Sequence, residues 1–119
     1  PHINYTNHVL SVLDTGEIIK GIAHITGGGL TENVPRILPE ECAVKIKRGS
    51  WPSLPVFDTI KELGNIDTKE MYRTFNMGIG MVFIVDQKSL NIISTALNKM
   101  TPVHKIGEVV EGSNSTNYV

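Results

Sequence analysis

The architecture of the chain is set by residues 18–38, which read IIKGIAHITGGGLTENVPRIL. Residues 18–25 carry apolar side chains on both faces of an extended chain, which predicts a central strand covered on both sides. Gly27, Gly28 and Gly29 then form a turn, and a short helical stretch runs to Leu38, where Pro39 stops it. In open α/β sheets, ligands bind beyond the carboxyl ends of strands, so we expect any site at this turn.

The start of that short helix is open on sequence alone. Asn33 is a good N-cap residue and would place Pro35 in the first turn, where proline is tolerated. A start at Leu30 would instead cost a backbone hydrogen bond at Pro35.

Outward from this segment, helical and extended patterns alternate. We expect helices over residues 6–13, over residues 55–64 with Ser53 as cap, over residues 68–75 with Asp67 as cap, and after Asp86. Two of them carry apolar stripes, namely Val56, Phe57, Ile60 and Leu63 in one, and Leu90, Ile93, Leu97 and Met100 in the other. Strands are expected at residues 42–48, 78–85 and 103–110, with an edge at 118–119. The pattern predicts an α+β or α/β fold, with a mixed sheet of four or more strands covered by helices.

Composition bounds the class of protein. The chain has 119 residues, of which 40% are hydrophobic, and a formal net charge of −1, so we expect one domain over residues 1–119. The balanced charge predicts no binding to nucleic acid or to an anionic membrane. Cys42 is the single cysteine, which excludes an internal disulfide and favours the cytoplasm. Pro1 is not an initiator methionine, so we expect the chain to begin partway through a longer product.

The glycine turn is the strongest local signal for chemistry. Alternation places Ile19, Gly21, Ala23 and Ile25 on one face of the strand, and Ile22, His24 and Thr26 on the other. Successive glycines let a ligand approach the peptide N–H groups, and N–H groups at a helix start attract anions. A flexible turn beside a buried, hydrogen-bonded histidine is the equal alternative. The pattern is neither a Walker loop nor a GxGxxG fingerprint.

Two arginines are weaker candidates. Arg36 could bind phosphate or carboxylate with two hydrogen bonds, and a solvated arginine is the equal alternative. Arg73, on the helix before Phe75, is read as an ion-pair or surface residue in preference to a phosphate ligand. The histidines lack metal-ligand spacing, so no metal ligands are assigned, and no residue is assigned a catalytic role.

Three blocks resemble the AIR synthetase family, the phosphoribosylformylglycinamidine cyclo-ligases. Residues 22–39, IAHITGGGLTENVPRILP, are similar to the family's signature, as are residues 70–81, EMYRTFNMGIGM. Residues 105–109 fit the family's closing strand. The blocks occur in the family's order and span nearly the whole chain. The second block separates this family from sister ATP-using families, such as selenophosphate synthetase and the hydrogenase-maturation proteins.

The resemblance implies the C-terminal half of an ATP-dependent enzyme of purine biosynthesis. Its substrates would be formylglycinamidine ribonucleotide and ATP, with ATP and Mg²⁺ bound mainly by an N-terminal half that this sequence lacks. The complete protein would be a homodimer, and this chain alone would be inactive. The alternatives are a sister ATP-using family or a non-catalytic small-molecule-binding module.

The resemblance also orders the candidate site residues. His24, Thr26, Gly27, Gly28 and Gly29 would form the lip of a substrate or phosphate cleft between the two halves. Asn33, Arg36, Arg73 and Asn76 follow as further binding residues. We expect Gly28→Val to cost activity with little loss of folding.

Overall fold

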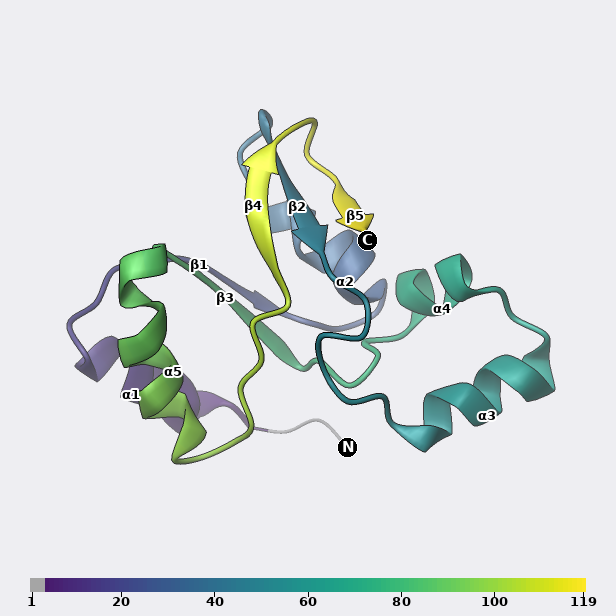
Figure 1. The fold of residues 1–119 in the computed structure, drawn as a ribbon, viewed down its shortest axis with the longest axis horizontal. Coiled ribbons are helices and arrows are strands. Elements are labelled where there is room, and N and C mark those ends of the chain that lie inside the picture. The colour runs from purple at the N-terminus through teal and green to yellow at the C-terminus, as the bar shows by residue number, and fades with distance from the viewer. Residues whose placement is uncertain (1–3) are drawn as a thin grey trace.

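The computed structural model describes residues 4–119, drawn in Figure 1. The elements in chain order are α1 (Thr6–Asp14), β1 (Ile19–His24), α2 (Gly29–Asn33), the 3₁₀ turn η1 (Pro35–Ile37), β2 (Cys42–Ile46), α3 (Pro55–Gly64), α4 (Thr68–Thr74), β3 (Met81–Val85), the 3₁₀ turn η2 (Gln87–Ser89), α5 (Leu90–Asn98), β4 (Gly107–Glu111) and β5 (Thr116–Tyr118). This confirms the predicted α+β class and the alternation of helices and strands.

The strands form two sheets instead of one. β1 pairs with β3 in an antiparallel ribbon, while β2 lies between β4, which runs antiparallel to it, and β5, which runs parallel. The mixed strand directions were expected, but a single sheet of four or more strands was not found. Both edges of β2 are occupied by β4 and β5, so the β1–β3 ribbon has no edge of that strand to join.

A bulge changes the faces of β1. Pairing with β3 is irregular between Ile19 and Gly21, so Ile19 no longer shares a face with Ala23. Ile19 packs with Phe83 and Val85 against the helices α1 and α5, whereas Ala23 faces the other core. The predicted grouping of Ile19 with Ala23 was therefore wrong, although the ribbon does lie between two apolar clusters.

The larger core lies between the ribbon, α2 and the three-stranded sheet. Its buried members are Ala23, Ile25, Leu30, Val34, Val44, Ile46 and Trp51. The Trp51 indole N–H donates to the Met77 carbonyl oxygen at 2.9 Å. Tyr72 stacks at a tilt on Tyr118, with ring centroids 4.6 Å apart, and the Tyr118 hydroxyl bonds to Thr31 Oγ1 at 2.8 Å. These contacts fasten β5 and α4 to the core.

The smaller core joins α1 to α5. Val12, Ile93 and Leu97 are buried there. Figure 1 shows this helix pair at one end of the molecule and the pair α3 and α4 at the other. No helix in residues 4–119 is both long enough and apolar enough to cross a membrane.

The short helix after the glycines begins early and avoids its proline. α2 starts at Gly29 and ends at Asn33, and Pro35 then opens the separate 3₁₀ turn η1. Pro35 therefore never has to donate an N–H within an α-helix. Asn33 does not act as the N-cap that one reading of the sequence proposed, because it lies at the end of α2.

The predicted caps were partly correct. Asp67 caps α4, since its carboxylate accepts the Glu70 N–H at 2.8 Å. Ser53 does not cap α3, where Leu54 is the N-cap residue and makes no side-chain bond. Asp86 precedes a 3₁₀ turn, and its carboxylate pairs with Lys20 Nζ at 2.8 Å instead of capping a helix. Hydrogen bonding to Lys20 lowers the pKa of Asp86.

Candidate functional site

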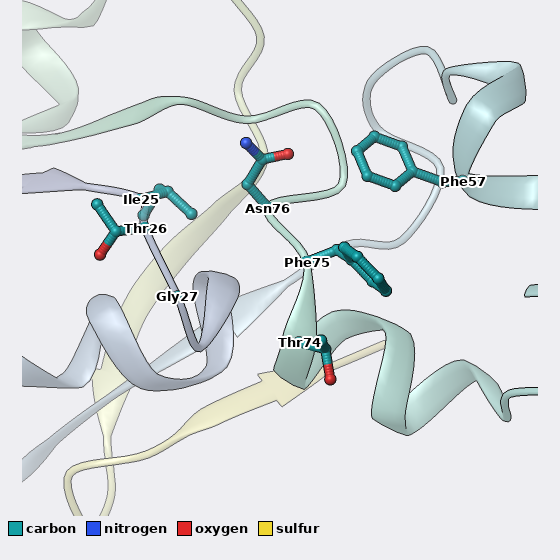
Figure 2. Close-up of a pocket in the computed structure, with 7 residues that line it drawn as sticks. All are labelled: Ile25, Thr26, Gly27, Phe57, Thr74, Phe75 and Asn76. Carbon is teal, nitrogen blue, oxygen red and sulfur yellow. The ribbon is translucent and has the colours of Figure 1, made fainter. Parts of the chain in front are cut away.

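A cavity of about 280 Å³ lies where β1 runs into the glycine turn. Its lining residues are Ile25, Thr26, Gly27, Phe57, Thr74, Phe75 and Asn76, all drawn in Figure 2. In this view Thr26 and Phe57 lie on opposite sides, with Asn76 and Phe75 between them. The cavity thus brings together three of the predicted residues, Thr26, Gly27 and Asn76.

Gly29 closes the turn by packing against α4. Its backbone is left-handed, with φ of 58°, and a Cβ built on it would lie 2.6 Å from the Tyr72 carbonyl oxygen and 2.3 Å from that of Phe75. Only glycine allows the chain to pass this close to the end of a neighbouring helix. Gly29 is buried, so its role is to place the turn and not to touch a ligand.

Gly27 and Gly28 differ in what a side chain would meet. Gly28 has φ of 96°, and an added Cβ would approach the Glu32 Cβ at 2.7 Å. Gly27 has no atom within 4 Å of such a Cβ and lines the cavity. The expectation that Gly28→Val leaves folding intact was therefore wrong, because valine is strained in that conformation. A side chain at position 27 would therefore begin in open space, beside the cavity that Gly27 lines.

Asn33 holds the turn in shape. Its Nδ2 donates to the carbonyl oxygens of Gly29 at 2.8 Å, Gly27 at 3.1 Å and Thr26 at 3.2 Å. Its Oδ1 accepts from Thr26 Oγ1 at 3.3 Å and from Arg36 Nη1 at 3.1 Å. The side chain is buried and its polar atoms are engaged within the protein. Neither Asn33 nor Arg36 lines the cavity, and both support the turn.

Arg73 lies on the surface. Its guanidinium is 3.8 Å from Glu32 Oε1 and 3.9 Å from Glu70 Oε2, and its side chain is 61% exposed. Pairs this exposed contribute little stability. The interpretation of Arg73 as an ion-pair residue is confirmed, and the structure does not place it in the cavity.

Asn76 presents hydrogen-bonding atoms to the cavity. Its Oδ1 accepts the Gly78 N–H at 2.8 Å, which fixes the side chain. Within residues 4–119, no acceptor for its Nδ2 is found. An amide held by its oxygen offers two N–H donors in a fixed direction.

His24 is exposed at the end of β1 and does not line the cavity. The alternative of a buried histidine was therefore wrong. The Tyr5 ring lies edge-on to both His24 and His8, with centroids 6.4 and 5.2 Å away. Gly80 makes this cluster fit, because a Cβ there would collide with the Tyr5 hydroxyl. The glycine at this strand start thus accommodates an aromatic side chain and not a neighbouring backbone.

Two aromatic residues of the cavity were missed. Phe57 and Phe75 lie with ring centroids 6.0 Å apart and form the apolar wall. Phe57 was read as part of an apolar helix stripe and Phe75 as the end of a helix, because nothing in their spacing separates a core position from a cavity wall. Thr74 and Ile25 complete the lining without any sequence signal.

The cavity is uncharged. None of its lining side chains titrates between pH 4 and 10. Within the described part of the chain, no group of three or more His, Cys, Asp or Glu residues is placed to hold a metal ion. The residues present therefore do not fit a Mg²⁺ site, and what the cavity offers is hydrogen-bond donors beside aromatic rings.

Comparison with known proteins places this fold and turn in a family. The pattern of the AIR synthase related protein, C-terminal domain, matches residues 1–119. The chain belongs to the AIR synthase related family. The resemblance of residues 22–39 and 70–81 to AIR synthetase is thereby confirmed, and the matched part is the family's C-terminal domain.

Relatives within the AIR synthase related family share a name. A protein of Acetivibrio thermocellus is 54% identical over 106 residues, which are 87% of this chain and 31% of the relative. One of Geobacillus thermodenitrificans is 50% identical over 96 residues, 80% of this chain and 28% of the relative. Both are phosphoribosylformylglycinamidine cyclo-ligases. The chain thus spans about a third of the length of the relatives it matches.

A solved structure shows the same fold. The hydrogenase maturation protein HypE of E. coli superposes with a TM-score of 0.72 at 21% identity, covering 98% of this chain and 36% of its own. At that identity the likeness concerns the AIR synthase related fold and not the activity.

Proposed function

We propose that this chain is the C-terminal part of a phosphoribosylformylglycinamidine cyclo-ligase. The observation that carries the proposal is the 54% identity over 106 residues to the Acetivibrio thermocellus enzyme of that name. The residues concerned include the glycine turn and most of the cavity wall. A hydrogenase-maturation role has only the fold in its favour.

The proposed reaction closes an imidazole ring. ATP transfers its γ-phosphoryl group to the formyl oxygen of formylglycinamidine ribonucleotide, which turns a poor leaving group into a good one. A nitrogen of the same molecule then attacks that carbon, and phosphate leaves as the ring of aminoimidazole ribonucleotide forms. Because nucleophile and electrophile belong to one molecule, correct positioning supplies much of the rate.

The role of this chain is to orient the substrate. Thr26, Gly27 and Asn76 line the cavity, and all three residues carry neutral hydrogen-bonding groups. Phe57 and Phe75 form its apolar wall. Among the residues that the structure describes, no carboxylate and no cationic side chain lines the cavity, which supports placing the Mg²⁺ ion, and ATP with it, mainly in the N-terminal half of the complete enzyme.

The remaining expectations concern assembly and location. We propose that the partner of this domain is its own N-terminal half, that residues 1–119 act as one unit, and that the complete enzyme is a cytoplasmic homodimer. The nearly neutral charge favours neither nucleic acid nor membrane partners.

The function is tested with a chimaera, in which this chain replaces the matching segment of the Acetivibrio thermocellus relative. ADP and phosphate release are measured with ATP, Mg²⁺ and formylglycinamidine ribonucleotide. We expect substrate-dependent release by the chimaera and none by this chain alone. A chimaera that folds and binds ATP but leaves this substrate unchanged would refute the cyclo-ligase assignment.

The cavity is tested at Gly27. In the chimaera, Gly27→Val should lower kcat/KM by roughly a hundredfold or more, because its two methyl groups would occupy space in the cavity that Gly27 lines. Gly27→Ala should have a smaller effect, and neither change should shift the melting temperature appreciably, since no protein atom lies within 4 Å of the new Cβ. Full activity of the valine variant would exclude the turn from the substrate site.

A further inference from the structure

Helix α3 carries an apolar stripe that the described chain covers only in part, at Ile60. Val56, Ile60 and Leu63, which we name the α3 stripe, recur at steps of four and three residues and therefore share one face of the helix. Val56 is 54% exposed and Leu63 is 85% exposed, while none of the residues of α3 is buried. Large apolar side chains aligned on one exposed face usually mark an interaction surface.

The rest of α3 already has partners, which fixes the direction of the stripe. The Phe57 ring contacts the Phe75 ring at the end of α4, and Lys61 Nζ donates to Thr68 Oγ1. These two residues hold α3 to α4 by the side of the helix next to the stripe. Figure 1 shows α3 at the end of the molecule, beside α4 and away from both sheets.

The stripe adjoins the cavity. Phe57, which follows Val56 on α3, lines the cavity, and Leu54 at the start of the helix is 48% exposed and packs on Gly78. A polypeptide seated on the α3 stripe would therefore lie next to the Phe57 wall and extend it.

Two features identify the occupant. The matched relatives are about three times as long as this segment, so most of their chain lies outside it. The matched part is the family's C-terminal domain, so the rest of the relatives' chain lies mainly N-terminal to it. An N-terminal half joined to this chain meets the stripe as part of one molecule, whereas a second copy would have to associate from solution.

We infer that the α3 stripe is the surface on which the N-terminal half of the same polypeptide docks, and that this contact completes the wall of the cavity beside Phe57. The inference rests on the proposed function, because it takes the cyclo-ligase as the complete protein. The α3 stripe would then be the contact that aligns this chain with the N-terminal half at the cavity.

The test compares thiol labelling of this chain alone and of the chimaera. Leu63→Cys places a thiol on the stripe, and Asp58→Cys places a control thiol on an exposed position of the same helix that faces away from the stripe. Both variants should fold, since neither position is buried. Maleimide labelling is followed by peptide-resolved mass spectrometry, which separates each new thiol from Cys42.

We expect the thiol at position 63 to react about tenfold or more slowly in the chimaera than in the chain alone, as for a group exposed only by local opening. The thiol at position 58 should change by less than about twofold. Equal labelling of position 63 in both proteins, or slowing that appears only as the concentration of the isolated chain rises, would overturn the inference, the second outcome by assigning the stripe to a second copy.

Turnover distinguishes failure of the inference from failure of the function. An active chimaera with a freely labelled position 63 would refute docking on α3 and leave the cyclo-ligase assignment standing. A folded, inactive chimaera in which position 63 is protected would support the docking surface and count against the reaction.

Discussion

Helices α5 and α3 have similar apolar patterns in the sequence, but the apolar face of α5 is buried and that of α3 is largely exposed. Both are short, and both repeat large apolar residues at three- and four-residue steps. In α5, Ile93 and Leu97 are 3% and 5% exposed and pack with Val12 of α1. In α3, Leu63 is 85% exposed. The spacing of apolar residues therefore predicts that one face of a helix will be buried. It does not say whether the residues that pack on this face belong to the same segment of the protein.

The difference follows from chain order. α5 comes directly after β3 and η2, so it folds back over the ribbon and meets α1 there. α3 stands between β2, whose two edges are already paired, and α4, where it contacts Thr68 and, just after the helix, Phe75. A helix without a sheet face to lie on keeps its stripe exposed unless a partner from elsewhere arrives.

We expect the largest loss of stability from a substitution in α5, the helix whose apolar face is buried. Leu97→Ala removes a buried side chain from a small core, so we expect the free energy of unfolding to fall by about 3 kcal/mol. Urea unfolding followed by circular dichroism measures it. A loss below about 1 kcal/mol would mean that α5 is held loosely and that its contrast with α3 is one of degree.

A similar contrast, on a smaller scale, lies within the glycine turn. Gly29→Ala should destabilise the chain by about 2 kcal/mol, because a left-handed backbone and two carbonyl oxygens oppose the new Cβ. Gly27→Ala, at an open position, should change stability by less than about 0.5 kcal/mol. Equal losses of stability for the two variants in thermal unfolding would show that the turn rearranges, so that Gly27 and Gly29 do not differ in the room they leave for a side chain.

The larger core also contains a titratable group, the Tyr118 phenol, whose burial makes the stability of the fold depend on pH. Burial raises the pKa of the Tyr118 phenol, so the folded chain holds that proton more tightly than the unfolded chain. Its stabilising effect is complete below about pH 10 and is lost as pH rises through the raised pKa.

Urea midpoints between pH 8 and 11.5 should therefore fall more steeply for the unaltered chain than for Tyr118→Phe. Tyr72 titrates in both proteins, and burial also raises its pKa, so the difference between the two curves isolates Tyr118. Parallel curves would indicate that β5 detaches before Tyr118 ionises.

We expect the smallest loss of stability from a substitution in α3. Leu63→Ala should alter the stability of the isolated chain by less than about 0.5 kcal/mol, because its side chain has almost no surface to lose. A loss comparable to that of Leu97→Ala in the same urea assay would show that α3 does pack within the chain.

Local signals predicted much of this fold. Asp67 with Glu70 three residues later identified the start of α4, and the apolar runs located β1 and β3. The bulge after Ile19 was not predictable, because it depends on how β1 meets Val85 and Ile84 of a distant strand. The division into two sheets was missed for the same reason, since pairing partners are a property of the whole chain.

The candidate site was predicted unevenly. Thr26 and Gly27 line the cavity, and the pattern of a strand followed by glycines had pointed to them, whereas Asn76, which also lines it, was named from the family resemblance. Asn33 was read as a cap or a ligand, and its true partners, three carbonyl oxygens of the turn, cannot be inferred from its residue type. Phe57 was assigned to an apolar stripe, since a phenyl ring beside a cavity and one in a core have the same sequence spacing.

The bonds from Asn33 have a consequence for binding affinity. Three successive glycines sample more backbone conformations than any other tripeptide, and ordering them around a ligand would normally weaken binding. Because Asn33 fixes three carbonyl groups of this stretch within the folded chain, that loss of conformational freedom occurs during folding. If the turn binds substrate as proposed, it does so already ordered, and the contacts at Gly27 would contribute nearly their full strength to affinity.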